Sequence, residues 1–392
     1  MNISEKIISY AADIGLSPVG IIDAEPLNNL KPWLENQRQD GLTPPFLHTS
    51  IQARIDPQLT LPGCQSIICL AIPYLGNWRV EEADMGLENP KDHPLLQSTG
   101  LNGKEEELCG EIARIACGQD YHRVFAAKAH QLINFMNEAS SSFFNYLVLS
   151  DTNPLLERAF FEKAGAVRGA NTTIISSAYG SWIALGLILV DFPLKNIPFE
   201  QTPSFRCLNC GRCLKACPTG ALHAPFQINP WRCLSFITQN KGIIPPSYRE
   251  LMGCRIYGCD TCQEVCPQNQ GQPFSPIQEF NPSVLPPTLP LKSLATINKK
   301  DYYLTIGQTA AGWRGRQTLR RNAIVALGNS KQPEAADLLN QLIQTDPSPL
   351  IRMHTAWALG QLNTTEARRI LAARLSTENS KQVNQEIRAA LT

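Results

Sequence analysis

The sequence has no long hydrophobic run: nothing in its 392 residues approaches the roughly 18 uninterrupted apolar residues that a membrane span needs. Its start, M-N-I-S-E-K-I-I-S-Y, includes a glutamate and lacks the apolar core of a secretory signal. Neither sign of charge dominates, because 35 Lys+Arg residues balance 34 Asp+Glu residues to a net charge of +1, which predicts no polyelectrolyte partner for the chain as a whole. We therefore expect a soluble, cytoplasmic protein without a membrane partner.

Two nucleotide-binding motifs are also missing. No G-x-G-x-x-G follows a predicted strand, and no P-loop is present. The chain therefore shows no sign of binding its own dinucleotide or of hydrolysing a nucleotide. If it carries out redox chemistry, its electrons must come from a partner protein.

Cysteine, by contrast, is abundant, and seven of the 13 cysteines fall in two short runs. The first run, C-L-N-C-G-R-C-L-K-A-C-P, begins at Cys207, and the second, C-D-T-C-Q-E-V-C-P, begins at Cys259. The spacing C-x2-C-x2-C-x3-C closed by proline is the bacterial ferredoxin arrangement, in which three thiolates hold one 4Fe-4S cluster and the fourth reaches another. The two runs predict an electron carrier with two 4Fe-4S clusters.

The same arrangement divides the ligands between the clusters. Cluster one takes Cys207, Cys210, Cys213 and Cys266. Cluster two takes Cys217, Cys259 and Cys262, and Cys233 in W-R-C-L-S is the candidate for its fourth ligand. Zinc is disfavoured because a structural site usually joins two separated C-x2-C pairs, whereas the first four thiols here are too crowded for one ion. Disulfides are not expected in a reducing compartment.

The remaining cysteines have simpler expectations. Cys64, Cys69, Cys109 and Cys117 lie in apolar or helical surroundings and should pack as small hydrophobes. Cys254, close to the second run, is left open as a spare thiol, a redox-sensitive neighbour or a replacement for a polar contact.

Length predicts more than one domain and an α+β multidomain fold. An amphipathic helix with Ile7, Ile8, Ala11 and Ile14 and strands at 66–74 and 146–150 indicate an α/β or α+β domain over 1–200. A ferredoxin-like module follows at 201–270. Six prolines between Pro273 and Pro290 predict an extended connector at 271–312, because proline removes amide donors.

An internal repeat occupies the last part of the chain. A-I-V-A-L-G at Ala323–Gly328 returns as T-A-W-A-L-G at Thr355–Gly360, and a shorter copy, I-R-A-A-L, ends at Leu391. The leucines of the three copies are 32 residues apart. This period predicts stacked helix pairs of the HEAT kind over 313–392, a module that binds rather than catalyses.

An arginine-rich stretch precedes the repeat. G-W-R-G-R-Q-T-L-R-R-N places Arg314, Arg316, Arg320 and Arg321 next to Trp313. A charge run is often a solvated helix face, but arginines beside an aromatic also suit phosphate contact and base stacking. The residues alone leave both interpretations open.

Asp151 follows the apolar strand Y-L-V-L-S and precedes a helical run. An acid at a strand end is well placed to face a ligand crevice. It is equally suited to capping the following helix, so this choice also stays open.

Six strings together resemble the epoxyqueuosine reductase family over almost the full length. They are R-I-D-P at Arg54, A-C-G-Q-D-Y-H at Ala116, D-T-N-P-L-L-E-R at Asp151, R-C-L-S-F at Arg232, R-I-Y-G-C-D-T-C-Q at Arg255 and G-W-R-G-R at Gly312. The resemblance implies a cobalamin enzyme that reduces epoxyqueuosine to queuosine at the wobble position of tRNA. It also implies a corrin without a histidine below the metal, and the chain lacks D-x-H-x-x-G, since D-Y-H-R-V-F at Asp120 ends in Phe125.

The resemblance assigns roles to individual residues. Asp151 matches the proton donor, and the same eight cysteines match the cluster ligands. The positions that match cobalamin contacts in the 1–200 domain and the cysteine module are Arg54, Asp151, Ser235, Asp260 and Thr261. The positions that match or adjoin tRNA contacts are Gln239, Lys241, Arg314, Arg316, Arg320 and Arg321. One departure is Ala170, in G-A-N where the family usually has G-K-N.

These roles imply an electron path. Reduced ferredoxin or flavodoxin feeds cluster one, cluster two produces cob(I)alamin, and Asp151 supplies a proton. We expect a monomer, as in the family. Two alternatives stay open: a corrinoid-dependent reductase or corrinoid-activating protein with another substrate, and a redox scaffold whose repeats bind protein. Binding of cobalamin and tRNA separates the three.

Overall fold

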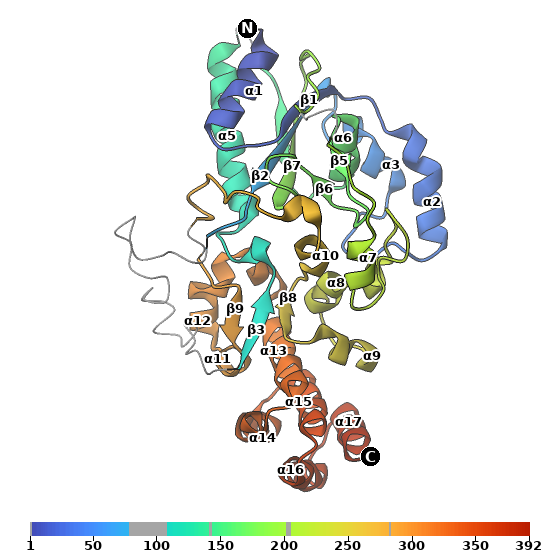
Figure 1. The fold of residues 1–392 in the computed structure, drawn as a ribbon, viewed down its shortest axis with the longest axis vertical. Coiled ribbons are helices and arrows are strands. Elements are labelled where there is room, and N and C mark those ends of the chain that lie inside the picture. Colours follow the sequence, from blue (N-terminus) through green and yellow to red (C-terminus); the bar gives the residue numbers. More distant parts are fainter. Residues whose placement is uncertain (1, 78–107, 141–142, 201–204, 282–283) are drawn as a thin grey trace. The chain divides into compact units, whose positions relative to one another are not determined.

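The computed structural model describes residues 2–77, 108–140, 143–200, 205–281 and 284–392 (Figure 1). The chain forms two compact units, and each is assembled from separate stretches of sequence. Unit one comprises Met1–Asn77, Gly118–Trp231 and Asp260–Pro282; unit two comprises Trp78–Cys117, Arg232–Cys259 and Ser283–Thr392. This grouping differs from the contiguous predicted domains because the chain leaves unit one within the cysteine module and returns to it at Asp260.

Unit one is built on a four-stranded, wholly antiparallel sheet with the strand order β1-β2-β7-β4. The strands are β1 (Val19–Asp23), β2 (Ser66–Pro73), β7 (Ile183–Val190) and β4 (Tyr146–Leu149). β2 is buried along its whole length, as expected for a strand covered on both faces. The strands predicted at 66–74 and 146–150 are confirmed.

Helices cover this sheet (Figure 1). α1 (Ile3–Asp13) and α5 (Tyr121–Ala139) pack together, with the rings of Tyr10 and Phe135 stacked at 4.3 Å. Phe125 of α5 lies so close to Gly186 of β7 that a Cβ there would be 2.1 Å from its ring. A second core contains side chains of α2 (Lys31–Gln39), α3 (Ile51–Ile55) and α6 (Glu157–Lys163). Cys64 and Cys69 are buried within it, as predicted.

Unit two begins with a three-stranded sheet of order β8-β3-β9, formed by β3 (Cys109–Ile112), β8 (Arg255–Tyr257) and β9 (Thr288–Pro290). Its shorter helices are α8 (Leu234–Gln239), α9 (Pro246–Arg249), α11 (Leu291–Thr296) and α12 (Lys299–Leu304). The prediction of an extended connector over 271–312 is therefore wrong from β9 onwards. Pro290 is the N-cap of α11, a position where the missing amide removes no helical hydrogen bond.

The repeats form five helices: α13 (Arg316–Ser330), α14 (Ala336–Thr345), α15 (Pro349–Leu362), α16 (Thr365–Leu375) and α17 (Lys381–Leu391). α13 packs on α15, and α15 on α17. A Cβ at Gly328 would lie 2.7 Å from the Cα of Ala358, and one at Gly360 would lie 2.8 Å from the Cβ of Ala390. The repeated A-L-G therefore supplies the small residue that lets successive helices approach, and the predicted helical stack is confirmed. None of the helices in the described ranges is long and apolar enough to cross a membrane.

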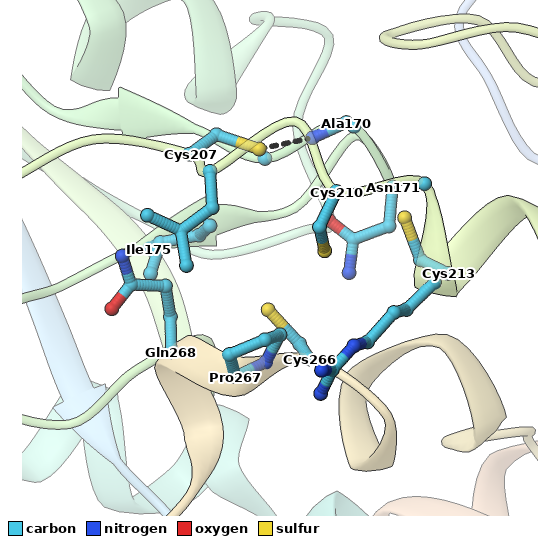
Figure 2. A pocket seen from close by; sticks show the side chains of 13 residues that line it. Ala170, Asn171, Ile175, Cys207, Cys210, Cys213, Cys266, Pro267 and Gln268 are labelled. Atoms are coloured by element: carbon cyan, nitrogen blue, oxygen red, sulfur yellow. Dashed lines mark hydrogen bonds between the residues drawn. The ribbon is translucent and has the colours of Figure 1, made fainter.

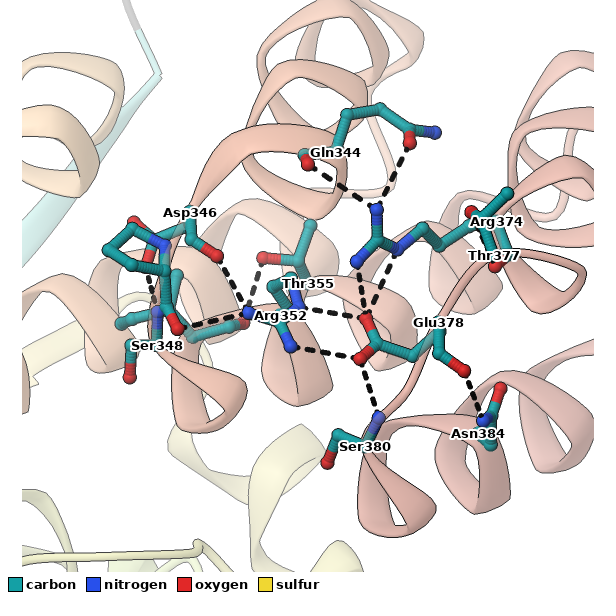
Figure 3. Close-up of polar contacts among 12 residues, drawn as sticks. Gln344, Asp346, Ser348, Arg352, Thr355, Arg374, Thr377, Glu378, Ser380 and Asn384 are labelled. Atoms are coloured by element: carbon teal, nitrogen blue, oxygen red, sulfur yellow. Dashed lines mark hydrogen bonds and ion pairs between the residues drawn. The ribbon is translucent and has the colours of Figure 1, made fainter.

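A buried carboxylate joins three of the repeat segments (Figure 3). Glu378 accepts hydrogen bonds from Arg352 Nε at 2.8 Å, Arg374 Nη2 at 2.7 Å and the amide of Ser380 at 2.8 Å. These contacts, led by the hydrogen bond from Arg352, outweigh burial and lower the pKa of Glu378 to about 2. Its charge therefore stabilises the folded repeats at neutral pH.

Replacing Glu378 with glutamine should destabilise the repeats in a pH-dependent way. The folded protein keeps Glu378 ionised down to about pH 2, whereas the unfolded chain binds the proton near the ordinary pKa of 4.5. The stabilisation is therefore complete above that value and is lost as the pH falls from about 4.5 to about 2. Chemical denaturation should show a loss of about 3 kcal/mol at pH 7 and a flatter acid limb in the variant.

Glu366→Gln is the matched control, because Glu366 pairs with Arg369 at 3.9 Å on an exposed face of α16. Exposed pairs contribute roughly 0 to 1 kcal/mol. An equal loss in the two variants would contradict the role of the buried network.

Candidate functional site

The four cysteines predicted for cluster one line a single hollow in unit one (Figure 2). Cys207 and Cys210 precede the short helix α7 (Arg212–Ala216), Cys213 lies in it, and Cys266 follows α10 (Thr261–Glu264). Gly211 has a φ of +70°, which lets the chain turn between Cys210 and Cys213.

Buried polar contacts bring Cys266 to the first run. Asn269, three residues later in the chain, accepts a hydrogen bond from the amide of Ser181 at 2.7 Å and donates to the carbonyl of Gln263 at 2.8 Å. Gly180 makes this approach possible, because a Cβ there would lie 2.2 Å from Asn269 Oδ1. The second cysteine run is thus fastened beside the start of β7.

The chemistry of this hollow fits a polynuclear cluster. No three His, Cys, Asp or Glu side chains in the described ranges are arranged around a single metal ion, whereas the four thiols surround a larger space in which each can bind a different iron. Burial, and then the neighbouring thiols, raise the pKa of Cys213. The amide of Ala170 donates to Cys207 Sγ at 3.3 Å.

The four cysteines predicted for cluster two belong to both units. Cys217 and Cys262 lie in unit one, and Cys233 and Cys259 lie in unit two. Burial alone would raise the pKa of Cys217, but hydrogen bonds from the amides of Leu222 and Thr219 lower it on balance, which favours the thiolate that a metal ligand needs. The assignment of these four cysteines to one cluster stays a prediction.

Asp151 lies directly after Ser150 at the end of β4 and is exposed. Its φ is +54°, in the left-handed region that Asp tolerates better than most residues. The Tyr121 hydroxyl donates to Asp151 Oδ2, and the Asp151 amide donates to Glu157 Oε1 at 2.7 Å. α6 begins at Glu157 with Leu156 as its N-cap, so Asp151 does not cap this helix and the capping interpretation is excluded.

Two ionisable groups beside Asp151 have shifted pKa values. Burial, and then the charge of Asp151, raise the pKa of Glu157. Burial alone would lower the pKa of His122, but its contact with Asp120, at 2.7 Å between Nδ1 and Oδ1, and the charge of Asp151 raise it. The charge of Asp151 contributes to both shifts, and perturbed pKa values of this kind are typical of functional sites.

Arg54 is a buried charge without a protein acceptor. It is 6% exposed, and its guanidinium makes no hydrogen bond within the part of the chain that the structure describes. Burial, and then the positive charge of Arg158, lower its pKa. A buried guanidinium is costly unless an acceptor satisfies it, so this position suits a ligand rich in carbonyl or phosphate oxygens.

The other predicted contacts are divided between the units. Asp260 and Thr261 begin α10 in unit one. In unit two, Ser235 Oγ accepts from Gln239 Nε2 at 3.1 Å, and Lys241 is exposed. Whether these residues contact cobalamin or tRNA stays a prediction.

Comparisons with known proteins identify the family. A 4Fe-4S double cluster binding domain matches residues 206–269, HEAT repeats match 314–392, and the family described as epoxyqueuosine reductase QueG, DUF1730, matches 54–152. The chain is 34% identical to the epoxyqueuosine reductase of Bacillus subtilis (strain 168), over 98% of this chain and 94% of that protein. The chain belongs to the epoxyqueuosine reductase family.

Solved structures of epoxyqueuosine reductases share the fold. A selenomethionine-labelled epoxyqueuosine reductase superposes with a TM-score of 0.87 at 31% identity, covering 100% of this chain and 99% of the other. A structure with a tRNA-Tyr epoxyqueuosine-modified stem loop has a TM-score of 0.85 at the same identity and coverage. The α+β multidomain fold and the family predicted from the sequence are confirmed.

The arginine run at 314–321 is divided between partly exposed and buried side chains. Arg314 stacks over Trp313 at 4.2 Å and Arg316 donates to the carbonyl of Ile297 at 2.7 Å; both are partly exposed. Arg320 and Arg321 are only 6% and 1% exposed. The tRNA-binding role predicted for these last two residues is therefore corrected.

Arg320 and Arg321 are not available to tRNA because their guanidinium groups form hydrogen bonds inside unit two. Arg321 donates to the carbonyls of Asn240 at 2.7 Å and Gly242 at 2.6 Å. Arg320 donates to the carbonyl of Ala295 at 2.7 Å and pairs with Asp346. Both residues fasten α13 to neighbouring segments, which no phosphate could reach without displacing these bonds.

The sequence did not predict the roles of three residues in the site. Tyr121 stood in the D-Y-H string but had no assigned role, Glu157 was part of D-T-N-P-L-L-E-R, and Ala170 was noted only for its missing charge. One signal in the sequence could have predicted the role of Glu157. It lies six residues after Asp151, at the start of a helix, where its carboxylate can accept a hydrogen bond from the Asp151 amide in the preceding loop.

Removing a ligand of cluster one should halve the iron content. After anaerobic reconstitution, Cys266→Ala should hold roughly half the iron and labile sulfide of the parent chain, because one of two clusters is lost. Cys254→Ala is the control, since Cys254 is also partly buried and close in sequence. Undiminished iron in the Cys266 variant would remove this residue from the ligand set.

Proposed function

We propose that the protein reduces epoxyqueuosine to queuosine in the anticodon loop of tRNA, with two 4Fe-4S clusters as its internal electron path. The observation that carries the proposal is that unit one holds both an exposed acid, Asp151, and the four-thiol hollow of cluster one. Family membership supports the substrate, because a related reductase has been solved with an epoxyqueuosine-modified tRNA stem loop.

Cobalamin is the second cofactor that we propose. Arg54, which is 6% exposed, fits a ligand with many oxygen acceptors, and the remaining contacts within unit one would come from Asp151, Asp260 and Thr261. When bound, cobalamin supplies a reduced, nucleophilic metal centre for opening the epoxide. The chain contributes the residues around it: Arg54 binds an acceptor, and Asp151 delivers a proton to the oxygen that leaves.

Two contacts prepare Asp151 for this role. Tyr121 binds one carboxyl oxygen and fixes its direction. Buried Glu157 holds the Asp151 amide, so the residue keeps its left-handed conformation and its carboxyl stays exposed. Burial and the charge of Asp151 raise the pKa of Glu157, so Glu157 adds no negative charge beside the acid when it is protonated.

Asp151→Asn should abolish the reaction without affecting the binding of tRNA. Loss of a positioned general acid costs on the order of 10² to 10⁴ in rate, measured as queuosine formed in a single turnover on tRNA that carries epoxyqueuosine. Tyr121→Phe should lose less, because it removes only the group that orients the acid. Both variants should bind the tRNA and reconstitute iron like the parent. A fully active Asp151→Asn variant would disprove the assigned role.

Arg314 and Arg316 should contribute to tRNA affinity. Their joint replacement by alanine should weaken binding and reduce the slope of log K against log salt by about two, since each phosphate contact contributes roughly one. Arg368 and Arg369, exposed on α16, provide a control with the same change in charge. If filter binding at several salt concentrations shows no difference between the two double variants, the proposed contacts are wrong.

A further inference from the structure

A long stretch of the cysteine module carries charge of one sign. Residues 201–249 contain six Lys or Arg residues and no Asp or Glu, in a chain whose net charge is only +1. Three of the six, Arg206, Arg212 and Lys215, alternate with the ligands of cluster one and are exposed. The positive charge of this part of unit one is thus concentrated around the thiols.

The thiol hollow reaches the surface at the same place. Cys210 is exposed, and Leu208, between two ligands, is 57% exposed although it is a large apolar side chain. Leu208 and Arg212 both line the hollow. Gln268 Nε2 donates to the carbonyl of Arg206 at 2.8 Å, which fixes the start of the run against the segment that carries Cys266. We call this surface the basic thiol face; it consists of Arg206, Leu208, Asn209, Cys210, Arg212 and Lys215.

We propose that the basic thiol face is the docking surface for an acidic one-electron carrier protein. This inference rests on the proposed function and adds the place where electrons are delivered. Complexes between redox proteins are small and short-lived, and opposite charges steer them together. Three exposed cations and one exposed apolar residue within ten residues of sequence match an acidic partner with a small apolar contact, which would place its reduced cofactor near Cys210.

RNA is the competing occupant of a basic surface, and the geometry favours the carrier. Arg212 and Lys215 stand between cluster ligands in the sequence and Arg206 directly precedes the first, so an RNA bound to these cations would cover Cys210 and obstruct any electron donor. The partly exposed Arg314 and Arg316 lie on a different unit. The carrier passes one electron at a time, becoming oxidised by one electron as the cluster is reduced by one.

The test reverses the charge of the face in the full, reconstituted chain. The variant Arg206→Glu, Arg212→Glu and Lys215→Glu is mixed anaerobically with a reduced, acidic flavodoxin, and bleaching of the cluster absorption is followed by stopped flow. At low salt the second-order rate constant should fall at least about tenfold, and its decrease with ionic strength should disappear. Titration of oxidised, isotope-labelled flavodoxin by NMR should show loss of binding, a readout that needs no turnover.

Two controls separate docking from general effects. Lys6→Glu, Lys31→Glu and Lys195→Glu make the same change in charge at exposed positions of unit one outside the cysteine module, and should alter the rate less than about threefold. Reduced methyl viologen, a small cation, should reduce the charge-reversed variant at least as fast as the parent. Because Arg212 adjoins two ligands, iron is quantified, and Arg206→Gln with Lys215→Gln serves as a milder second variant.

An unchanged flavodoxin rate in both variants of the face would overturn the inference. So would a loss of tRNA affinity with unchanged flavodoxin kinetics, which would assign the face to RNA. The proposed function is tested separately: with a chemical reductant, the charge-reversed variant should form queuosine like the parent. If the parent forms none under these conditions, the proposed function fails whatever the docking result.

Discussion

One geometric constraint governs unit one: four thiols from two distant stretches must surround a single hollow. Cys207, Cys210 and Cys213 come from one run, and Cys266 returns after the chain has contributed residues 232–259 to unit two. The buried contacts of Asn269 with Ser181 and Gln263 hold the second run in place. The discontinuous units follow from this requirement, because a cluster can be closed only if the chain comes back.

The position of Asp151 in unit one depends on hydrogen bonds with other residues of the same unit. Asp151 adopts a left-handed conformation because Glu157 accepts its amide hydrogen bond, and its carboxyl is directed by Tyr121. Arg54 is the opposite case, a largely buried cation for which the described residues supply no hydrogen-bond acceptor. Asp151, held by two contacts, and Arg54, without a described acceptor, both belong to unit one and are the protein groups on which the proposed cobalamin site depends.

Sequence patterns predicted the features of the fold that depend on regular spacing of residues. The strands around Ile67 and Val148, the 32-residue repeat and the cysteine runs all carry periodic signals that survive without a structure. Patterns did not distinguish arginines that bind phosphate from arginines that stabilise the fold. Arg320 and Arg321 look like phosphate contacts, yet their guanidinium groups bind carbonyls inside unit two, because helical phase and neighbouring segments decide exposure. Proline content likewise did not reveal that residues 288–304 form β9, α11 and α12, and Tyr121 acquires its role only through tertiary folding.

The exposure of Cys210 and Leu208 also has a consequence for handling the protein in air. A surface that admits a protein carrier to the thiols admits dissolved oxygen as well, and oxidation of cysteine follows access and thiolate character. The contacts of Glu378 in the repeats involve no cysteine, so we expect aerobic damage to begin at the basic thiol face while the helical stack stays folded. A preparation can thus look intact by circular dichroism and molecular mass after its route for electrons has been lost.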